Sequence, residues 1–122
     1  MKSYILIIED DAWMAAQHSR VLEKADYKTR AISNAHEAID VIDKKIPDAI
    51  ILDVLLPGST GFALLHELQS YSDTGIIPII LCTNLASEIS IHDLVPYGVK
   101  RILDKSTMEP SDLVVAVRSV LL

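Results

Sequence analysis

Five short apolar runs, each followed by a segment whose apolar residues recur at helical spacing, most constrain how this 122-residue chain can fold. Three of the runs are continuously apolar, which is typical of strands that helices cover on both faces. The other two are mixed and suit the edges of a sheet. In chain order the runs are Tyr4–Ile8, Tyr27–Ile32, Ala49–Leu52, Ile76–Cys82 and Val99–Leu103.

This alternation predicts an α/β fold of five strand–helix units around a doubly wound, five-stranded parallel sheet. Connections between parallel strands are right-handed, so helices cover both faces of the sheet. With the polar second run at one edge and the most apolar runs in the centre, the strand order is the flavodoxin-like 2-1-3-4-5. We expect five helices. The fourth, near Ala86 to Val95, should be short or distorted because Pro96 removes a hydrogen bond from its last turn.

Composition narrows the class of protein. The formal net charge is −6, from 11 basic and 17 acidic residues, and no basic run exceeds a pair, so direct nucleic acid binding is not expected. No apolar run is long enough for a signal peptide or a membrane span. The single cysteine, Cys82, excludes an intramolecular disulfide. We therefore expect residues 1–122 to form one cytoplasmic domain without an output domain.

Polar residues follow the ends of four expected strands. Ligands of such sheets bind at the carboxyl ends of the strands, where the strand order reverses. Clustered carboxylates repel one another without a cation, and acids together with a phosphate suit Mg²⁺. A hydroxyl and an ammonium group would complete a phosphoryl site in which an aspartate is the nucleophile. The residues are Glu9, Asp10 and Asp11, then Asp53, Thr83 and Lys105.

Each of these residues also has an ordinary structural interpretation. Asp53 could cap a turn, Lys105 could be a solvated charge, and Thr83 could be a simple strand residue. Their occurrence at successive strand ends, in this order, favours a shared site over independent structural roles.

Four segments carry a family resemblance: ILIIEDD, AIILDVLLPGSTG, IPIILCTN and RILDKS. In order and spacing they resemble those of receiver domains of bacterial two-component response regulators, over essentially the whole chain. The resemblance implies that Asp53 accepts a phosphoryl group from a sensor histidine kinase or a phosphotransfer protein. It implies that Glu9, Asp10, Asp53 and the backbone carbonyl of Leu55 bind Mg²⁺, and that Asp11 is an additional acid.

The resemblance implies further roles. Lys105 matches the phosphate-contacting lysine, and Thr83 matches the hydroxyl residue that moves towards the phosphoryl group on activation. Pro57 and Gly61 match the loop after the phosphorylation site. The aromatic switch residue of the family is replaced here by Ile102, so its coupling to the hydroxyl group cannot take the usual form.

Another departure is Ser106, which replaces the proline that usually follows the lysine. Together with Ile102 it leaves open an alternative, a pseudo-receiver that acts as an interaction module without phosphorylation. A phosphatase with an aspartyl nucleophile is less favoured, because Leu55 occupies the position of the second acid of that class.

The main prediction is therefore a phosphoacceptor that switches its partner-binding face. It is not an enzyme beyond its own Mg²⁺-dependent phosphorylation and dephosphorylation. Its output partner is not identified, and a homodimer through the face between the fourth and fifth helices is a further expectation. Cys82 is expected to be a small buried hydrophobe. The four histidines lack metal-ligand spacing and are expected at the surface or its boundary: His18, His36, His66 and His92.

Overall fold

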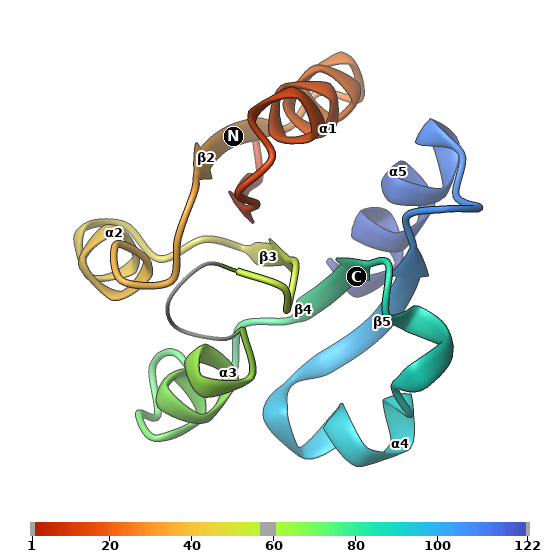
Figure 1. The fold of residues 1–122 in the computed structure, drawn as a ribbon. Helices are drawn as coiled ribbons and strands as arrows, with labels where there is room; N and C mark the ends of the chain where they lie inside the picture. Colours follow the sequence, from red (N-terminus) through yellow and green to blue (C-terminus); the bar gives the residue numbers. More distant parts are fainter. Residues whose placement is uncertain (1, 57–60, 122) are drawn as a thin grey trace.

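The computed structural model describes residues 2–56 and 61–121 and contains a five-stranded parallel sheet in the order β2-β1-β3-β4-β5 (Figure 1). The predicted α/β class and strand order are therefore confirmed. The strands are β1 Tyr4–Ile8, β2 Lys28–Ile32, β3 Ala49–Leu52, β4 Ile79–Thr83 and β5 Val99–Asp104.

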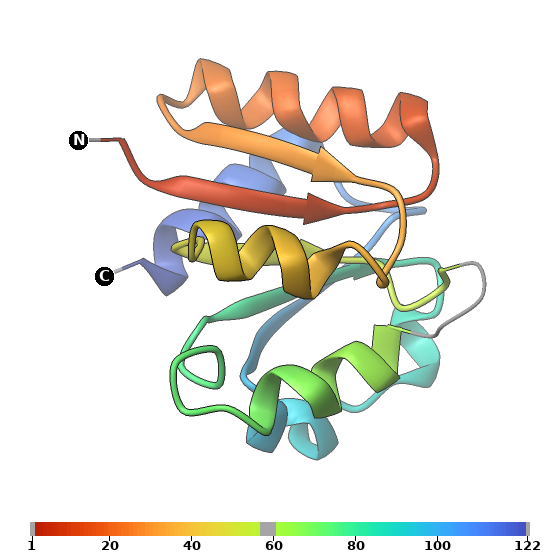
Figure 2. The same ribbon diagram turned by 90° about the vertical axis from the view of Figure 1, so that its left-hand side faces the viewer.

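The helices cover both faces of this sheet. Figure 1 shows α1 and α5 on one face and α2 and α3 on the other. Figure 2 shows that β1 and β2 run in the same direction and that their arrowheads point to the same end of the molecule. The helices are α1 Ala12–Lys24, α2 Ala38–Lys44, α3 Gly61–Gln69, α4 Ile91–Leu94 and α5 Pro110–Val120.

Successive side chains of the central strands point to opposite faces, which creates two apolar clusters. Ile5 of β1 packs with Leu22 of α1 in the cluster beneath α1 and α5. Its neighbour Leu6 belongs to the cluster on the other face, with Ile42 of α2 and Leu65 of α3. All of these side chains are completely or almost completely buried. Burial of each of these side chains contributes about 1.5–3 kcal/mol to the stability of the fold, so the sheet holds the residues at its edge in fixed positions.

The fourth helix is short, as predicted. α4 has only four residues, and single-turn 3₁₀ helices lie on both sides of it, at Ala86–Glu88 and Val95–Tyr97. Pro96 lies in the second of these turns. Gly98 follows with a φ of 85°, a left-handed conformation that glycine adopts without strain.

The prediction that the fourth strand begins at Ile76 is wrong, since β4 begins at Ile79. The side chain of Ile76 is 81% exposed, and the N–H of Ile77 donates to the Thr74 carbonyl in a turn. Pro78 has no N–H to donate to a neighbouring strand. Only the part of this apolar run that follows Pro78 therefore pairs in the sheet. Smaller differences are that β2 begins at Lys28 and that β5 extends to Asp104.

Candidate functional site

The register of the central strands places the carboxyl ends of β1 and β3 side by side. Ile8 lies opposite Leu52, and the N–H of Asp53 donates to the Ile8 carbonyl at 3.1 Å. The side chains of Glu9 and Asp53 therefore leave adjacent strands at the same level. One carboxylate oxygen each from Glu9, Asp10 and Asp53 lies within 4.8 Å of the others. The structure thus brings three predicted site residues together, with Glu9 and Asp53 buried and Asp10 exposed.

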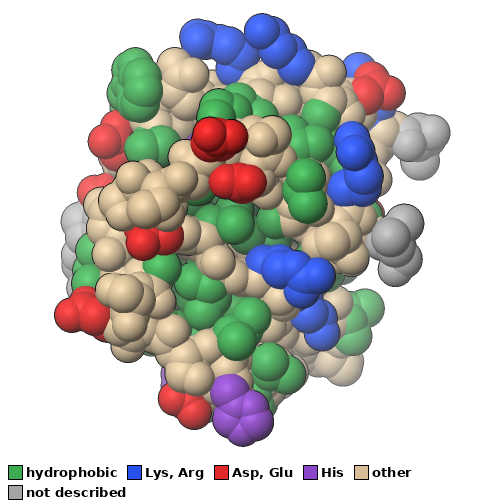
Figure 3. Space-filling model, turned by 90° about the vertical axis from the view of Figure 1, so that its right-hand side faces the viewer, with side chains coloured by type: hydrophobic (Ala, Val, Ile, Leu, Met, Phe, Trp, Pro, Cys, Tyr) green, Lys and Arg blue, Asp and Glu red, His purple; other side chains and the backbone are tan. Residues whose placement is uncertain are grey.

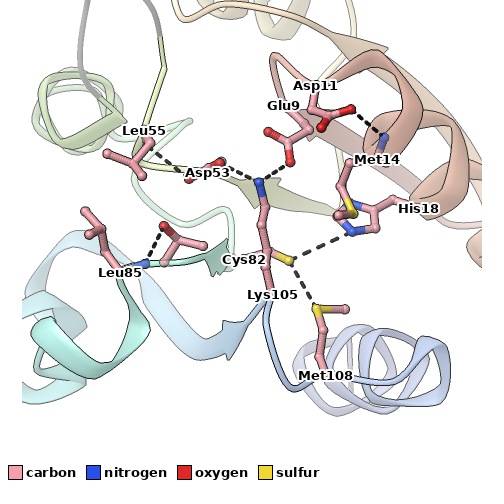
Figure 4. Close-up of polar contacts among 11 residues, drawn as sticks. Glu9, Asp11, Met14, His18, Asp53, Leu55, Cys82, Leu85, Lys105 and Met108 are labelled. Carbon is pink, nitrogen blue, oxygen red and sulfur yellow. Dashed lines mark hydrogen bonds and ion pairs between the residues drawn. The ribbon is translucent and has the colours of Figure 1, made fainter.

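Lys105 lies between the two buried acids. Its Nζ is 2.6 Å from Oδ2 of Asp53 and forms a second ion pair with Oε1 of Glu9 (Figure 4). The backbone holds this arrangement, because the N–H of Lys105 donates to the Thr83 carbonyl at 3.1 Å. Burial lowers the pKa of the Lys105 ammonium, but the hydrogen bonds and charges of Asp53 and Glu9 more than offset this, so the pKa is raised. Lys105 is therefore firmly cationic. We call Glu9, Asp53 and Lys105 the acid cluster.

Glu9 is the member of the acid cluster whose burial is least compensated by hydrogen bonds. It is 3% exposed, and its Oε2 has no hydrogen-bond partner in the described part of the chain. Burial raises the pKa of its carboxyl to about 7, although Lys105 acts in the opposite direction. A buried oxygen without a partner is costly, and a divalent cation would satisfy it. The donors present, which are carboxylate oxygens, therefore fit Mg²⁺.

The third acid of the run, Asp11, turns away from the acid cluster. Its side chain caps α1, where Oδ1 accepts a hydrogen bond from the N–H of Met14 at 3.0 Å. Capping satisfies one of the unpaired N–H groups in the first turn of a helix. The three consecutive acids thus separate, with Glu9 and Asp10 at the site and Asp11 at the helix that follows.

Thr83 and Leu55 border the acid cluster. Thr83 is fully buried, and its Oγ1 accepts a hydrogen bond from the N–H of Leu85 at 3.2 Å. The Leu55 N–H donates to Oδ1 of Asp53 at 3.0 Å, so the loop after β3 folds back on this carboxylate. The role predicted for the Leu55 carbonyl stays a prediction. The side chain of Leu55 is half-exposed.

Comparison with known proteins identifies the family. A profile of the response regulator receiver domain matches residues 5–118. The chain belongs to this receiver domain family. It is 32% identical, over 117 residues, to the phosphate regulon transcriptional regulatory protein PhoB of Pseudomonas aeruginosa, a match that covers 96% of this chain and 51% of PhoB. It is 28% identical to the DNA-binding response regulator MtrA of Mycobacterium leprae, covering 98% of this chain and 51% of MtrA. The chain thus spans about half the length of these curated relatives.

Solved structures agree with this assignment. The receiver domain of a signal transduction histidine kinase from Syntrophus aciditrophicus is 32% identical, with a TM-score of 0.83 over 98% of this chain and 89% of that one. The chemotaxis response regulator CheY4 of Vibrio cholerae is 25% identical, with a TM-score of 0.86 over 99% of this chain and all of that one. The receiver fold is therefore shared.

Two positions distinguish this receiver domain from the family pattern. Ile102 on β5 lies opposite Leu81 and packs against the apolar cluster beneath α2 and α3. It is half-buried and packed against this cluster, not fully exposed to solvent. Ser106 donates both its N–H, at 2.9 Å, and its hydroxyl, at 2.6 Å, to Oδ1 of Asp104. No described peptide bond is cis, so this turn holds the loop with a trans bond.

The loop after the candidate phosphoacceptor is described only in part. Pro57, which the resemblance assigns to this loop, lies outside the described residues. Gly61 begins α3, and a Cβ atom there would lie 2.6 Å from the Cα of Val54. A glycine is therefore required for this close approach of the helix to the end of β3.

One predicted location is wrong: His18 is buried, with 4% of its surface exposed. Burial lowers the pKa of its imidazole to about 4, and the nearby charge of Lys105 acts in the same direction. Cys82 is buried, as predicted. The proximity of these two residues to each other and to Met108 could not be predicted from the sequence, because each comes from a different element. The burial of His18 could have been predicted from its position, which is one helical turn after Met14 on the face of the helix towards the sheet.

No helix within residues 2–56 and 61–121 is both long and apolar enough to cross a membrane.

Proposed function

We propose that this receiver domain is a phosphoacceptor, in which Asp53 takes a phosphoryl group with the help of Mg²⁺. The observation that carries the proposal is the convergence of three acids and one largely buried lysine at the point where the strand order of the sheet reverses. The contact between Lys105 and Asp53 places a cation beside the proposed nucleophile. The membership of the family supports the same chemistry.

In the proposed step, a carboxylate oxygen of Asp53 attacks the phosphorus of a phosphohistidine on the donor protein. The new O–P bond forms as the N–P bond breaks, and the electron pair of that bond leaves with the imidazole. The ammonium of Lys105 would then bind a phosphoryl oxygen, in a charge-assisted hydrogen bond of the kind it now makes with the acids. Glu9, Asp10, Asp53 and the Leu55 carbonyl would hold Mg²⁺, which neutralises phosphoryl charge.

Thr83 is suited to report the presence of a phosphoryl group. Its hydroxyl oxygen already accepts a hydrogen bond from the N–H of Leu85, and a hydroxyl group can donate its own proton as well. Donation to a phosphoryl oxygen would pull the start of the β4–α4 segment towards the acid cluster. The neighbouring α4 is a single short turn between 3₁₀ helices, so it offers little resistance to such a movement.

The partners in this proposal are a sensor histidine kinase or a phosphotransfer protein, and an output protein. The surface of α4, β5 and α5 is the proposed region of changed contact, including contact between two copies of the chain. Exposed apolar side chains on it are Ile91, Val95 and Val115. Figure 3 shows hydrophobic side chains interspersed with charged ones on this side of the molecule. The proposal includes a cytoplasmic location and no turnover of a separate substrate, both of which rest on the family.

The test is the intact mass of the protein after incubation with acetyl phosphate, with and without Mg²⁺. We expect one phosphoryl adduct that requires Mg²⁺ and is absent in Asp53→Asn. The matched control is Asp43→Asn, which removes an exposed acid from α2 and should leave the adduct unchanged. An adduct on Asp53→Asn would place the chemistry elsewhere.

The absence of any adduct on the wild-type protein would favour the pseudo-receiver instead. The observation that favours this second candidate is the packing of Ile102, which has neither the aromatic ring nor the exposed starting position of the family's switch residue. Binding of a partner protein by the Asp53→Asn variant, with unchanged affinity in the presence of acetyl phosphate and Mg²⁺, would support it directly.

A further inference from the structure

Three side chains that the proposed phosphoryl chemistry does not use meet on the α1–α5 side of the sheet. They are His18 of α1, Cys82 of β4 and Met108 of the loop before α5. Sγ of Cys82 lies 3.9 Å from Nε2 of His18 and 3.3 Å from Sδ of Met108 (Figure 4). Met14, one helical turn before His18, lines the same cavity as His18. We call His18, Cys82 and Met108 the sulfur cluster.

The burial of His18 has no compensating hydrogen bond. Nδ1 has no hydrogen-bond partner within residues 2–56 and 61–121, and Nε2 has only the long contact with a thiol sulfur. Buried polar groups in folded proteins are almost always paired, because an unpaired donor or acceptor costs free energy. The imidazole therefore directs Nε2 towards the sulfur atom of Cys82, and its Nδ1 stays unpaired among the described residues, at a cost in free energy.

We propose that His18, Cys82 and Met108 bind a soft monovalent metal ion of the Cu(I) class. Thiolate and thioether ligands select Cu(I) over hard cations such as Mg²⁺, and imidazole also suits copper. Bonds of about 2.0–2.3 Å from a metal to nitrogen and sulfur place the donor atoms about 3.3–4 Å apart. The two observed separations lie in this range before any rearrangement.

A cavity borders two of the three proposed ligands. This cavity of about 210 Å³ is lined by His18 and Met108, by Met14 and Lys105, and by the exposed Trp13. On binding, an S–Cu bond replaces the S–H bond of Cys82, and the proton leaves to solvent. Burial raises the pKa of this thiol to about 12, so only a cation with high affinity for thiolate displaces the proton at neutral pH. The imidazole is already neutral, as a ligand must be.

Anaerobic competition for Cu(I) with the chromophoric chelator bicinchoninate tests the site on the full chain. We expect one Cu(I) per chain, and an affinity at least about 100-fold lower in Cys82→Ser, since even outer-shell changes cost 10–100-fold. Met108→Leu and His18→Gln should weaken binding as well. The matched control is His36→Gln, which removes an exposed histidine and should bind like the wild type. Equal affinity in the Cys82→Ser and wild-type proteins would overturn the proposal.

A second measurement needs no variant in the core. Ag(I), which has the same ligand preference and no colour, is added to wild-type protein carrying ¹³C-methyl methionine. A shift of the Met108 methyl signal at one equivalent supports the site. A shift confined to the methyl signal of Met1, or none, would overturn it even if a core variant failed to fold. Neither measurement uses acetyl phosphate or Mg²⁺, so the outcome is independent of the proposed phosphorylation.

Discussion

The acid cluster and the sulfur cluster are neighbouring buried polar regions that are stabilised in different ways. In the acid cluster, one ammonium compensates two carboxylates, and one oxygen of Glu9 has no hydrogen-bond partner among the described residues. In the sulfur cluster, the side chains are neutral, and Nδ1 of His18 is unpaired within residues 2–56 and 61–121. The first therefore has an excess of negative charge, whereas the second has unused soft donors. Under the two proposals made above, one receiver core would offer a hard cation site and a soft one.

The two clusters also respond to pH in opposite directions. The Glu9 carboxyl has a pKa raised from 4.5 to about 7, so its folded form holds a proton more readily than the unfolded chain does. Its contribution to stability is full below pH 4.5 and is lost as the pH rises through 7. His18 has a pKa lowered from 6.5 to about 4. Its contribution is full above pH 6.5 and is lost as the pH falls through 4.

The largest expected effect is that of Glu9→Gln, which removes the excess negative charge of the acid cluster. Without Mg²⁺ at pH 8, the variant should be up to about 3 kcal/mol more stable than the wild type, because a neutral amide replaces a carboxyl group whose pKa burial raises to about 7. The gain should shrink towards zero at pH 4.5. Urea unfolding in the presence of a chelator measures both values.

Added Mg²⁺ provides the control for this prediction. The ion should stabilise the wild-type protein by mass action and have a much weaker effect on Glu9→Gln. Equal stability of the two proteins at pH 8 without metal would show that Lys105 alone balances the acids.

The location of the acid cluster was predictable from the sequence because it follows from topology. Once five alternating runs imply a parallel sheet, the residues after β1 and β3 must meet at one edge, and so Glu9 and Asp53 are brought together without knowledge of any side-chain packing. What could not be predicted is how the acids divide. Asp11 has the same side chain as Asp10, and only the start of α1 at Ala12 makes it a cap.

The sulfur cluster was not predictable for the opposite reason. His18, Cys82 and Met108 are far apart in the chain and meet through the packing of α1 and the β5–α5 loop on one face of the sheet. No spacing rule links such residues. The predicted start of β4 was wrong because of a local detail. The apolar run Ile76–Cys82 contains Pro78, and the residues before this proline form a turn, so the strand begins only after it. Topology was thus easier to predict than side-chain contacts.

A smaller effect is expected for His18→Leu, which tests the pH dependence expected for the sulfur cluster. The wild type should lose about 2 kcal/mol between pH 6.5 and 5 through this residue, because the unfolded chain binds the proton first. The variant should lack that part of the acid sensitivity. Its stability at pH 7.5 should be equal or slightly greater, since an apolar side chain replaces an unpaired nitrogen.

Thermal or urea unfolding across this pH range checks the prediction for His18, with His36→Gln as the matched variant. Both variants lose one histidine, but only His18 is buried. The same pH dependence in His18→Leu and His36→Gln would mean that the imidazole of His18 gains a proton without cost, which contradicts its neutral state in the core.

The smallest effect is expected at Asp11, the acid of the run that belongs to neither cluster. Asp11→Ala should destabilise the protein by about 1 kcal/mol, because the N–H of Met14 loses its capping partner. Asp11→Asn should have almost no effect, since asparagine caps a helix about as well. Neither change should alter the affinity for Mg²⁺, measured through the fluorescence of the exposed Trp13. If Asp11→Asn weakened Mg²⁺ binding as strongly as Asp10→Asn, Asp11 would have to belong to the acid site, and the separation of three consecutive acids into site and cap would be wrong.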